Sequence, residues 1–333
     1  MPNSVLKKLD KKKYKWLVTG ISGFIGQNIL QYLISKNQIV YGIDINDIKK
    51  ENLIKIFKKQ EKRKKNFHFL KGNMLNINFL KKNFTNFDFI LHQAASSSVP
   101  LSIKKPKFVY ENNVKSFLNL LEVSRINNIK KIVYASSSAL YSDTRSTSEN
   151  ILIKNLLSPY AESKYANECL ASFYNKKMKM NVVGLRYFNV FGPFCNKIGK
   201  NLPVISNWIN KILKNKNTEI FGSKIQTRDF VYVKKVAEYN VIIAISKNKK
   251  FIYNIGTGIE TKLIDLFKLI KKKISKKKRV TSVIKFSKER TGDIKKSLAN
   301  LKLLNKEYKI DCNISLGFGL EKTIEYFLNS EKK

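Results

Sequence analysis

The sequence has few cysteines, two histidines and no long apolar run. Its cysteines, Cys169, Cys195 and Cys312, are widely spaced, odd in number and without metal-ligand spacing, so we expect neither a disulfide framework nor a metal site. No apolar run approaches the ~20 residues that span a bilayer. Residues 1–15 lack the apolar stretch of a secretory signal. These absences predict a cytoplasmic protein with reduced thiols, no metal and no membrane partner.

Negative charge is also scarce. The chain has 24 acidic and 65 basic residues, a net charge of +41, and such a balance is typical of proteins that bind nucleic acid or an anionic membrane. The excess is nevertheless spread along the whole chain, and no RNA-binding signature accompanies the lysines. Only seven of the basic residues are Arg, the residue suited to bidentate phosphate contacts. We interpret the charge as a bias toward lysine and expect no nucleic-acid partner.

Residues 16–44 form a strand–turn–helix–strand pattern. An apolar strand is followed by Gly20-x-x-Gly23-x-x-Gly26, a helical pattern, and a second apolar strand that ends at Asp44. Glycines at this spacing let the backbone approach a pyrophosphate, which the helix N-terminus stabilises. A carboxylate at the end of the second strand accepts hydrogen bonds from ribose hydroxyls and repels a 2′-phosphate. The pattern predicts dinucleotide binding, with NAD favoured over NADP.

The alternation of strands and helices continues well beyond this unit. Further strands are predicted at 67–70, 87–91, 131–136 and 181–185, and helices at 109–126, 160–175, 204–213, 233–246, 263–274 and 316–328. The predicted fold class is α/β, a Rossmann-type doubly wound parallel sheet with a smaller α/β C-terminal substrate domain. We assign residues 1–14 to an N-terminal extension, 15–194 to the NAD-binding domain with a returning segment near 229–256, and 195–333 mainly to the substrate domain.

Small and polar residues follow the predicted strands, where parallel sheets bind ligands. They are Asn73 and Met74 after the third strand, placed to reach the adenine, and Gln93, Ala94, Ala95, Ser97 and Ser98 after the fourth. His92 has no acidic partner or second ligand nearby in the sequence. We therefore interpret His92 as a packing residue.

Tyr160 and Lys164 are four residues apart and therefore share one face of a predicted helix. An ammonium beside a phenol stabilises the phenolate, so we expect the pKa of Tyr160 to fall from about 10 toward the working pH. Ser137, at the end of a strand, can hydrogen-bond a reacting hydroxyl and relay its proton. A Tyr-x-x-x-Lys pair alone equally describes a surface helix. Its position after Ser158-Pro159, and downstream of the glycine-rich turn, indicates a catalytic set.

With these motifs the chain resembles the extended short-chain dehydrogenases/reductases, and among them the NAD-dependent nucleotide-sugar epimerase/dehydratase family. The resemblance covers residues 15–327 and is carried by Thr19-Gly20-x-x-Gly23-x-x-Gly26, His92-Gln93-Ala94-Ala95, residues 136–141, Tyr160–Lys164, residues 186–193, Arg228-Asp229-Phe230 and Arg290-Thr291-Gly292-Asp293. Bacterial UDP-N-acetylglucosamine 4-epimerases are the most similar members. Ser116, Ser142 and Asn73 depart from the family pattern, and only the last affects an expected ligand contact, that of the adenine.

The resemblance implies a role for each matching residue. Tyr160 is implied to be the catalytic base and acid, Lys164 its partner, and Ser137 the catalytic serine. NAD is implied to contact Gly20, Gly23, Phe24, Ile25, Gly26, Asp44, Asn73, Met74, Gln93, Ala94, Ala95, Asn113, Tyr160, Lys164 and Tyr187. The UDP-sugar substrate is implied to contact Ser97, Ser98, Ser137, Ser138, Tyr160, Asn189, Val204, Arg228, Arg290, Asp293 and Ser297. For Arg228 and Arg290 a surface salt bridge is the alternative.

The implied reaction inverts the sugar at C4. Tyr160 removes the 4-hydroxyl proton while a hydride passes to NAD, and the transient 4-keto sugar turns about its diphosphate before the hydride returns to the opposite face. Dehydratases of the family need added acid/base carboxylates just after the catalytic serine, and decarboxylases have a Glu there. Here Ser138 and Ala139 occupy these positions. Both readings are therefore weakened.

Ser297 is the second discriminating position. In the resembling 4-epimerases a bulky residue at this site admits only plain hexoses, whereas a small one leaves room for an N-acetyl group; the alternative is an ordinary surface serine. We predict interconversion of UDP-GlcNAc and UDP-GalNAc, with UDP-Glc and UDP-Gal as secondary substrates.

Two other functions stay open. The first is another nucleotide-sugar epimerase, dehydratase or decarboxylase of the family. The second is a non-catalytic NAD-binding protein whose basic surface holds RNA or membrane. The resemblance also implies a homodimer formed through the helices 109–126 and 160–175. It implies that the product serves surface polysaccharide or lipopolysaccharide synthesis.

Overall fold

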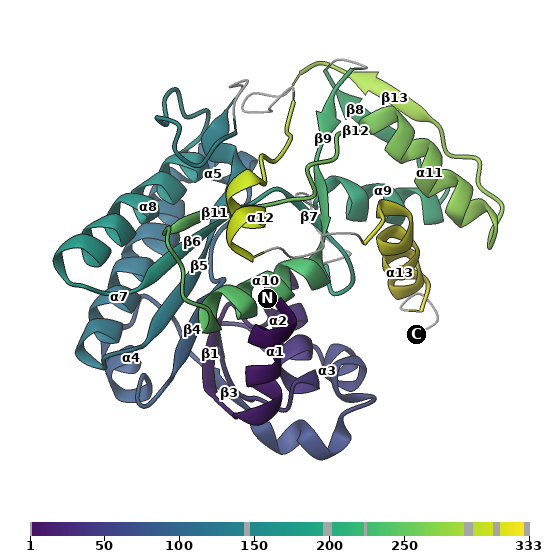
Figure 1. Cartoon of the computed structure of the whole chain (residues 1–333). Helices are drawn as coiled ribbons and strands as arrows, with labels where there is room; N and C mark the ends of the chain where they lie inside the picture. Colours follow the sequence, from purple (N-terminus) through teal and green to yellow (C-terminus); the bar gives the residue numbers. More distant parts are fainter. Residues whose placement is uncertain are drawn as a thin grey trace.

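The computed structural model describes residues 2–142, 147–195, 202–222, 225–289, 296–308 and 314–329. Within these residues, seven strands form one sheet in the order β11-β6-β5-β4-β1-β2-β3 (Figure 1). The strands are β1 (Lys15–Thr19), β2 (Ile39–Asp44), β3 (Phe67–Lys71), β4 (Phe89–His92), β5 (Lys131–Ser137), β6 (Val182–Tyr187) and β11 (Ile252–Ile255). Neighbouring strands of this sheet are all parallel. The predicted Rossmann-type sheet is confirmed.

Helices cover both faces of the sheet (Figure 1). One face packs against α2 (Phe24–Ser35) and α10 (Val233–Ile245), and the other against α4 (Ile77–Asn83), α7 (Ser116–Ile126) and α8 (Pro159–Lys177). Because successive side chains of a strand point to opposite faces, Trp16 and Val18 of β1 enter one core while Leu17 enters the other. Burial on both faces explains why these strands are continuous apolar runs.

The strand order reverses between β1 and β4. The chain proceeds from β1 to β2 and β3 on one side, and β4, β5 and β6 follow on the other. Loops at the carboxyl ends of β1 and β4 therefore diverge and leave a crevice, which is where open α/β sheets bind ligands. The register places Thr19 beside His92 and Ser137 beside Tyr187 at this edge. The sheet thereby gathers the motifs found in the sequence.

The predicted long helix over 109–126 is helical throughout, but it contains a π-helical turn that the sequence did not indicate. The chain forms α6 (Pro106–Tyr110), a π-helical turn η2 (Glu111–Lys115) and then α7. Side chains bond to the backbone around this turn, because Asn112 donates to the Phe108 carbonyl and Ser116 to the Asn112 carbonyl. Such polar side chains compete with regular helical hydrogen bonding.

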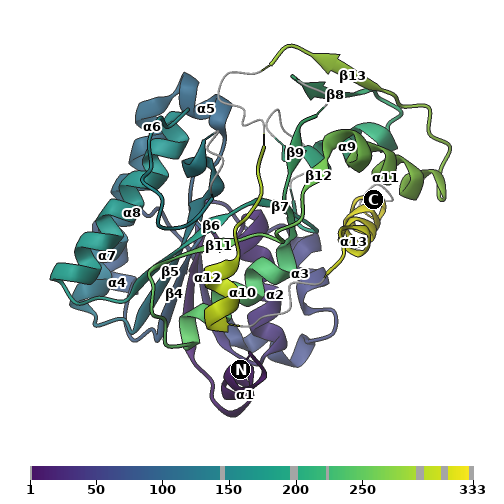
Figure 2. The ribbon, with the colours of Figure 1, turned by 45° about the horizontal axis from the view of Figure 1, so that its top comes forward.

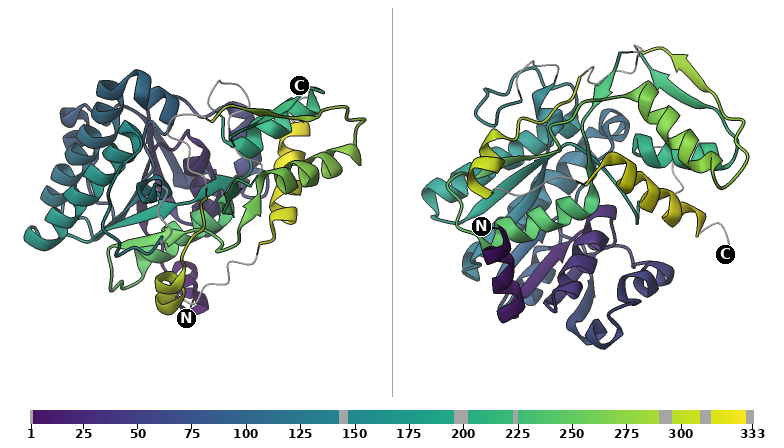
Figure 3. Two further views of the ribbon diagram at one scale, coloured as in Figure 1. Left: turned by 90° about the horizontal axis from the view of Figure 1, so that it is seen from above. Right: turned by 45° about the vertical axis from the view of Figure 1, so that its right-hand side comes forward.

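A second lobe has its own apolar core, formed largely by α9 (Val204–Leu213), α11 (Leu263–Ser275) and α13 (Leu316–Leu328). These helices lie together, apart from the sheet (Figures 2 and 3). Two short strand pairs complete the lobe: β8 (Thr218–Phe221) with β13 (Ile284–Ser287), and β9 (Thr227–Arg228) with β12 (Thr261–Lys262). All three helices were predicted from their apolar periodicity to within one residue.

Several segments join the two parts. β7 (Asn189–Phe191) pairs with β10 (Phe230–Tyr232), after which α10 and β11 rejoin the large sheet. The N-terminal helix α1 (Pro2–Lys11) packs on α10 and buries Leu9. Within the described ranges, every helix is too short or too polar to cross a bilayer.

Candidate active site

The glycine-rich turn connects β1 to α2 and can be made only with small residues. Gly20 has a φ of +67°, and a Cβ there would lie 2.6 Å from the backbone nitrogen of Ala94. A Cβ on Gly26 would lie 2.2 Å from the carbonyl oxygen of Gly20. Gly23 precedes α2 and has no side chain to cap it, so the first-turn amides are available to an anion. The turn is therefore suited to a diphosphate.

Two adjoining cavities share Gly20, Gly23, Gln93 and Ala95 in their walls. The smaller, of about 240 Å³, is lined by Asp44, Asn73, Met74 and Ala94 among others. The larger, of about 760 Å³, is lined by the predicted residues Phe24, Ile25, Gly26, Ser97, Ser137, Ser138, Tyr160, Lys164, Tyr187, Asn189, Val204, Arg228 and Ser297. Residues predicted from separate motifs thus meet around one continuous space.

Asp44 closes β2 at the wall of the smaller cavity. Its Oδ2 accepts from the Ser22 amide at 3.0 Å and its Oδ1 from the Asn46 amide at 3.0 Å. Asn73 accepts from the Leu75 amide at 2.9 Å, which shapes the turn after β3. A carboxylate and an amide are thereby held in the smaller cavity, whose lining does not include Tyr160.

Ser137 and Tyr160 meet at the wall of the larger cavity. Ser137 ends β5, and its Oγ accepts from the Ala139 amide at 3.1 Å, which starts the short helix η3 (Ser138–Tyr141). Ser158 caps α8 by accepting from the Ala161 amide at 3.2 Å, and Pro159 occupies the first helical position. This start places Tyr160 in the first turn of α8, where it hydrogen-bonds Ser137.

Lys164 lies one turn further along α8 and is 2% exposed. Its Nζ donates to the Ala135 carbonyl at 2.9 Å and lies 6.0 Å from the centroid of the Tyr160 ring. Burial lowers the pKa of Lys164 to about 8. The ammonium form therefore still predominates at neutral pH.

The predicted fall in the pKa of Tyr160 is wrong for this structure. Burial raises the pKa of the phenol, and the hydrogen bond with Ser137 lowers it by a smaller amount. The Lys164 ammonium is bonded to a carbonyl of β5 instead of to the phenol. Loss of solvation thus outweighs the favourable contacts.

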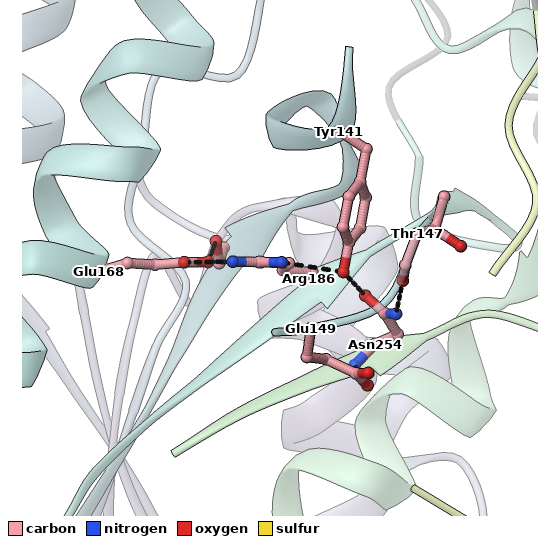
Figure 4. A network of polar contacts seen from close by, with 7 residues as sticks. Tyr141, Thr147, Glu149, Glu168, Arg186 and Asn254 are labelled. Atoms are coloured by element: carbon pink, nitrogen blue, oxygen red, sulfur yellow. Dashed lines mark hydrogen bonds and ion pairs between the residues drawn. The ribbon is translucent and has the colours of Figure 1, made fainter. Parts of the chain in front are cut away.

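A buried ion pair fastens α8 to the sheet (Figure 4). Arg186 of β6 donates Nε to Oε1 of Glu168 at 2.9 Å and Nη2 to Oε2 at 2.7 Å. Ser136 donates to the same Oε1 at 2.6 Å. Because Ser136 precedes Ser137 and Glu168 lies one turn beyond Lys164, the pair fixes the strand and the helix that carry the predicted catalytic residues. Nothing in the sequence singled out Glu168 beyond its place on the same helix face.

The network continues from Arg186 to the other side of β6 (Figure 4). Arg186 Nη1 donates to the Tyr141 hydroxyl at 2.9 Å, and that hydroxyl donates to Asn254 Oδ1 of β11 at 2.7 Å. Asn254 in turn donates to the Thr147 carbonyl at 2.6 Å and, through its backbone, to Glu149 at 2.9 Å. One arginine thereby joins η3, two strands and the segment after residue 146.

Asn113 lies behind the cavity wall instead of on it. Its Oδ1 accepts from the Ser96 amide at 2.7 Å, and its Nδ2 donates to the Ser96 carbonyl and to Ser163 Oγ at 2.9 Å. Asn113 thus holds the loop after β4 against α8. Ser98 is also absent from both walls and caps α5 (Val99–Lys104) by accepting from the Leu101 amide.

His92 is buried, as expected of a packing residue. Its Nδ1 lies 2.7 Å from Thr19 Oγ1, and its ring stacks on Phe117. Burial and the nearby Lys164 charge lower the pKa of His92 to about 3. The described residues contain no group of three acidic, His or Cys side chains placed to hold a metal ion.

Two predicted substrate contacts, Arg290 and Asp293, lie outside the described residues. Other residues of the larger cavity were not predicted, among them Asn207 and Trp208 of α9 and Gln226 before β9. Asn207 and Trp208 lie one helical turn beyond Val204. This helical spacing from Val204 is the one feature of the sequence that could have predicted their place in the cavity wall.

The chain is similar to known nucleotide-sugar enzymes over almost its whole length. A solved UDP-N-acetylglucosamine 4-epimerase of Methanobrevibacter ruminantium, in complex with UDP-N-acetylmuramic acid, is 31% identical with a TM-score of 0.86, covering 96% of this chain and 99% of that one. A UDP-glucose 4-epimerase of Thermotoga maritima with UDP-glucose is 29% identical with a TM-score of 0.83, covering 95% and 99%.

A sequence relative and a family model agree with these structures. The UDP-glucuronate 4-epimerase of Thermodesulfobacterium geofontis is 29% identical, covering 93% of this chain and 95% of its own. The model of the NAD dependent epimerase/dehydratase family matches residues 16–256, which include the glycine-rich turn, Ser137, Tyr160 and Lys164. The chain therefore belongs to the NAD-dependent epimerase/dehydratase family.

Proposed function

We propose that this protein is a 4-epimerase that interconverts UDP-GlcNAc and UDP-GalNAc, with UDP-Glc and UDP-Gal as secondary substrates. The observation that carries the proposal is one cavity lined by Ser137, Tyr160 and Lys164 together with Arg228 and Ser297. The first three can move a proton at a sugar hydroxyl. Arg228 offers a cation for the diphosphate, and Ser297 leaves space beside the sugar.

NAD, the cofactor of the family, fits the residues around the glycine-rich turn. Uncapped amides at the start of α2 suit its pyrophosphate, and Asp44 in the smaller cavity suits a ribose diol. In this proposal residues 15–194, with the returning segment 229–256, bind NAD, and residues 195–333 mainly bind the nucleotide sugar. When bound, NAD supplies the hydride acceptor and donor that inversion at C4 requires.

The side chains of this protein manage the proton. Tyr160 accepts the proton of the sugar 4-hydroxyl and, once the sugar has turned, returns a proton to the 4-oxygen, while Ser137 hydrogen-bonds that oxygen. Because burial raises the pKa of Tyr160, ionisation needs nearby positive charge, and the Lys164 ammonium supplies it from the next turn. Ser138 and Ala139 add no second acid or base, which favours epimerisation over elimination of water.

The charges in the described part of the cavity lining favour a neutral sugar. Among the described residues, Lys164 and Arg228 are the cations in its lining. Both already have a partner in the proposed complex, namely the reacting phenol and the diphosphate. A uronate would need a further cation or donor for its carboxylate. Ser297, which is 6% exposed, is small enough for an N-acetyl group to lie beside it.

A nucleotide-sugar panel followed by proton NMR of the anomeric signals tests the proposal. Purified protein given UDP-GlcNAc should form UDP-GalNAc without added NAD, and UDP-glucuronate should be unchanged. Turnover of UDP-Glc alone would contradict the role given to Ser297. If no nucleotide sugar reacts, and the protein instead retains RNA in a salt-sensitive manner, the enzymatic proposal is wrong.

A further inference from the structure

Asp229 is a carboxylate that the proposed chemistry does not use, although it is completely buried. It lies between β9 and β10. Its Oδ1 accepts from the Thr257 amide at 2.8 Å and the Thr257 hydroxyl at 2.6 Å, and its Oδ2 accepts from the amides of Gly258 at 2.8 Å and Ala299 at 3.1 Å. The four donors are neutral dipoles. A buried charge is costly, and these hydrogen bonds offset part of that cost.

The backbone of Asp229 reaches the wall of the larger cavity. Its carbonyl oxygen accepts from the Asn189 amide at 3.0 Å and from Asn189 Nδ2 at 3.2 Å. Arg228 precedes Asp229 in the chain, and both Arg228 and Asn189 line the cavity. Displacement of Asp229 would therefore move two of the expected nucleotide contacts at once.

The carboxylate also holds the segment that carries Ser297. Ala299, whose amide donates to Asp229, is two residues beyond Ser297. Lys296, on its other side, pairs with Thr227 in a parallel bridge. Ser297 is thus fixed from both directions by Thr227 and Asp229, the two residues that flank Arg228.

Thr147 anchors the same segment from the sheet side. Its Oγ1 donates to the Leu298 carbonyl at 2.7 Å and accepts from the Asn300 amide at 3.0 Å. Packing around Asp229 is also tight, because a Cβ on Gly256 would lie 2.8 Å from Asp229 Oδ2 and 2.5 Å from the Cβ of Ala299. Neither Asp229 nor the segment around Ala299 can shift without losing one of these contacts.

We propose that Asp229 is a positioning residue that sets the relative places of Asn189, Arg228 and Ser297, and thereby determines affinity for the nucleotide sugar and discrimination between sugars. This inference rests on the proposed function for its substrate. Asp229 is absent from the lining of both cavities and does not touch the reacting atoms. Its effect therefore belongs to binding and selectivity and leaves the proton transfer at Tyr160 largely intact.

The substitution Asp229→Asn tests this role, because its NH₂ group would face amides that need an acceptor. We expect the KM for UDP-GlcNAc and the calorimetric Kd for UDP to rise about tenfold or more, while kcat changes less than about threefold. The ratio of kcat/KM for UDP-GlcNAc over UDP-Glc should fall. Amide hydrogen exchange in a peptide over 296–301 should accelerate. Asp265→Asn, which removes an exposed carboxylate from the first turn of α11, should leave all five quantities unchanged.

A second variant covers the case in which Asp229→Asn does not fold, as judged by thermal melting. Thr147→Val removes the other anchor of the Ser297 segment and leaves Asp229 in place. It should lower the sugar ratio and speed exchange over 296–301, while the Kd for UDP stays at its wild-type value. Unchanged exchange and an unchanged ratio would overturn the assignment.

The exchange measurement separates this inference from the proposed function. It needs no turnover and no ligand, so it remains decisive if the wild-type protein epimerises none of the UDP-sugars. A folded Asp229→Asn protein with wild-type exchange over 296–301 would overturn the positioning role, even if the epimerase activity were established.

Discussion

At the scale of the residue, the proposed chemistry depends on the hydroxyl of Tyr160. We expect Tyr160→Phe to lower kcat by at least about 100-fold, because the ring remains and only the proton-transfer group is lost. The Kd for UDP should stay within about twofold. Tyr165→Phe, a partly exposed tyrosine on the same helix, is the matched control and should retain turnover. Initial rates by NMR give kcat, and calorimetry with UDP gives the Kd. Near-normal turnover by Tyr160→Phe would contradict the role of Tyr160 in proton transfer.

Ser297 offers a test of sugar selection. Ser297→Tyr adds a ring at a position that lines the larger cavity, so it should reduce kcat/KM for UDP-GlcNAc at least about tenfold more than for UDP-Glc. Ser297→Ala keeps the position small and should preserve the wild-type ratio. Competition between the two substrates in one tube gives the ratio directly. Equal losses on both sugars would show that the ring disturbs the fold or the nucleotide instead.

His92 predicts a pH-dependent stability. Its pKa is about 3 in the folded state, below the ordinary 6.5, so the unfolded chain binds more protons between these values. The contribution of His92 is present above pH 6.5 and is lost as the pH falls toward 3. It amounts to about 1.4 kcal/mol per pH unit within that window.

Urea unfolding at pH 7 and pH 5 should therefore show that wild type loses about 2 kcal/mol more than His92→Gln. His68→Gln, which replaces the other histidine of the chain, an exposed one, should behave as wild type. The same acid-dependent loss in all three proteins would mean that His92 titrates normally.

At the scale of the element, α8 is held to β6 by the buried pair of Glu168 and Arg186, which are 8% and 3% exposed. Glu168→Gln should lower the free energy of unfolding by about 3 kcal/mol, since it leaves a buried guanidinium without its counter-charge. Glu325→Gln breaks a partly exposed pair with Lys322 within α13 and should cost less than about 1 kcal/mol. Urea titration of the two variants measures the contrast. Similar small losses would show that the pair does not secure α8.

At this scale the sequence could predict those features that depend on residues close together in the chain. The strands are apolar runs because both of their faces are buried, and the Gly20 turn and the Tyr160–Lys164 face follow from short-range backbone geometry. The helix over 109–126 was predicted, whereas its π-helical turn, around which Asn112 bonds to the Phe108 carbonyl, was not.

Contacts between distant segments could not be read in this way. Thr147 and Leu298 are 151 residues apart, and Asp229 and Ala299 are 70 apart. Asp229 lies in the Arg228-Asp229-Phe230 motif, but nothing in the local sequence of any of these residues indicates its distant partner. Only the fold shows that they anchor the Ser297 segment, just as only the fold places Asn113 behind the cavity wall.

At the scale of the whole molecule, the lysine excess does not gather in the described part of the cavity lining. The larger cavity has Lys164 and Arg228 as its described cations, although the chain carries 65 basic residues. The pairs that the described acidic residues make with Lys are mostly on the surface, for example Lys71 with Asp47 and Lys64 with Glu61. Selection of an anionic substrate therefore depends on two placed cations in the described lining more than on the overall charge.

The outer faces of α7 and α8 carry apolar side chains, which leads to a final prediction. Leu118 and Phe173 are 38% and 50% exposed on these neighbouring helices. Two copies related by a twofold axis could bury such faces against each other, so we propose a homodimer through α7 and α8. Light scattering after size exclusion should give twice the chain mass for wild type and the chain mass for Phe173→Glu.

Phe251→Glu provides the matched control for this dimer, because Phe251 is 45% exposed just before β11 and belongs to neither α7 nor α8. It should remain dimeric. A monomeric wild-type protein, or dissociation of both variants, would contradict the interface. Tyr160 and Lys164 lie on α8 itself, so the monomeric Phe173→Glu protein should also have a lower thermal midpoint and a lower kcat. A monomer with both quantities unchanged would show that the Glu168–Arg186 pair alone holds α8 in place.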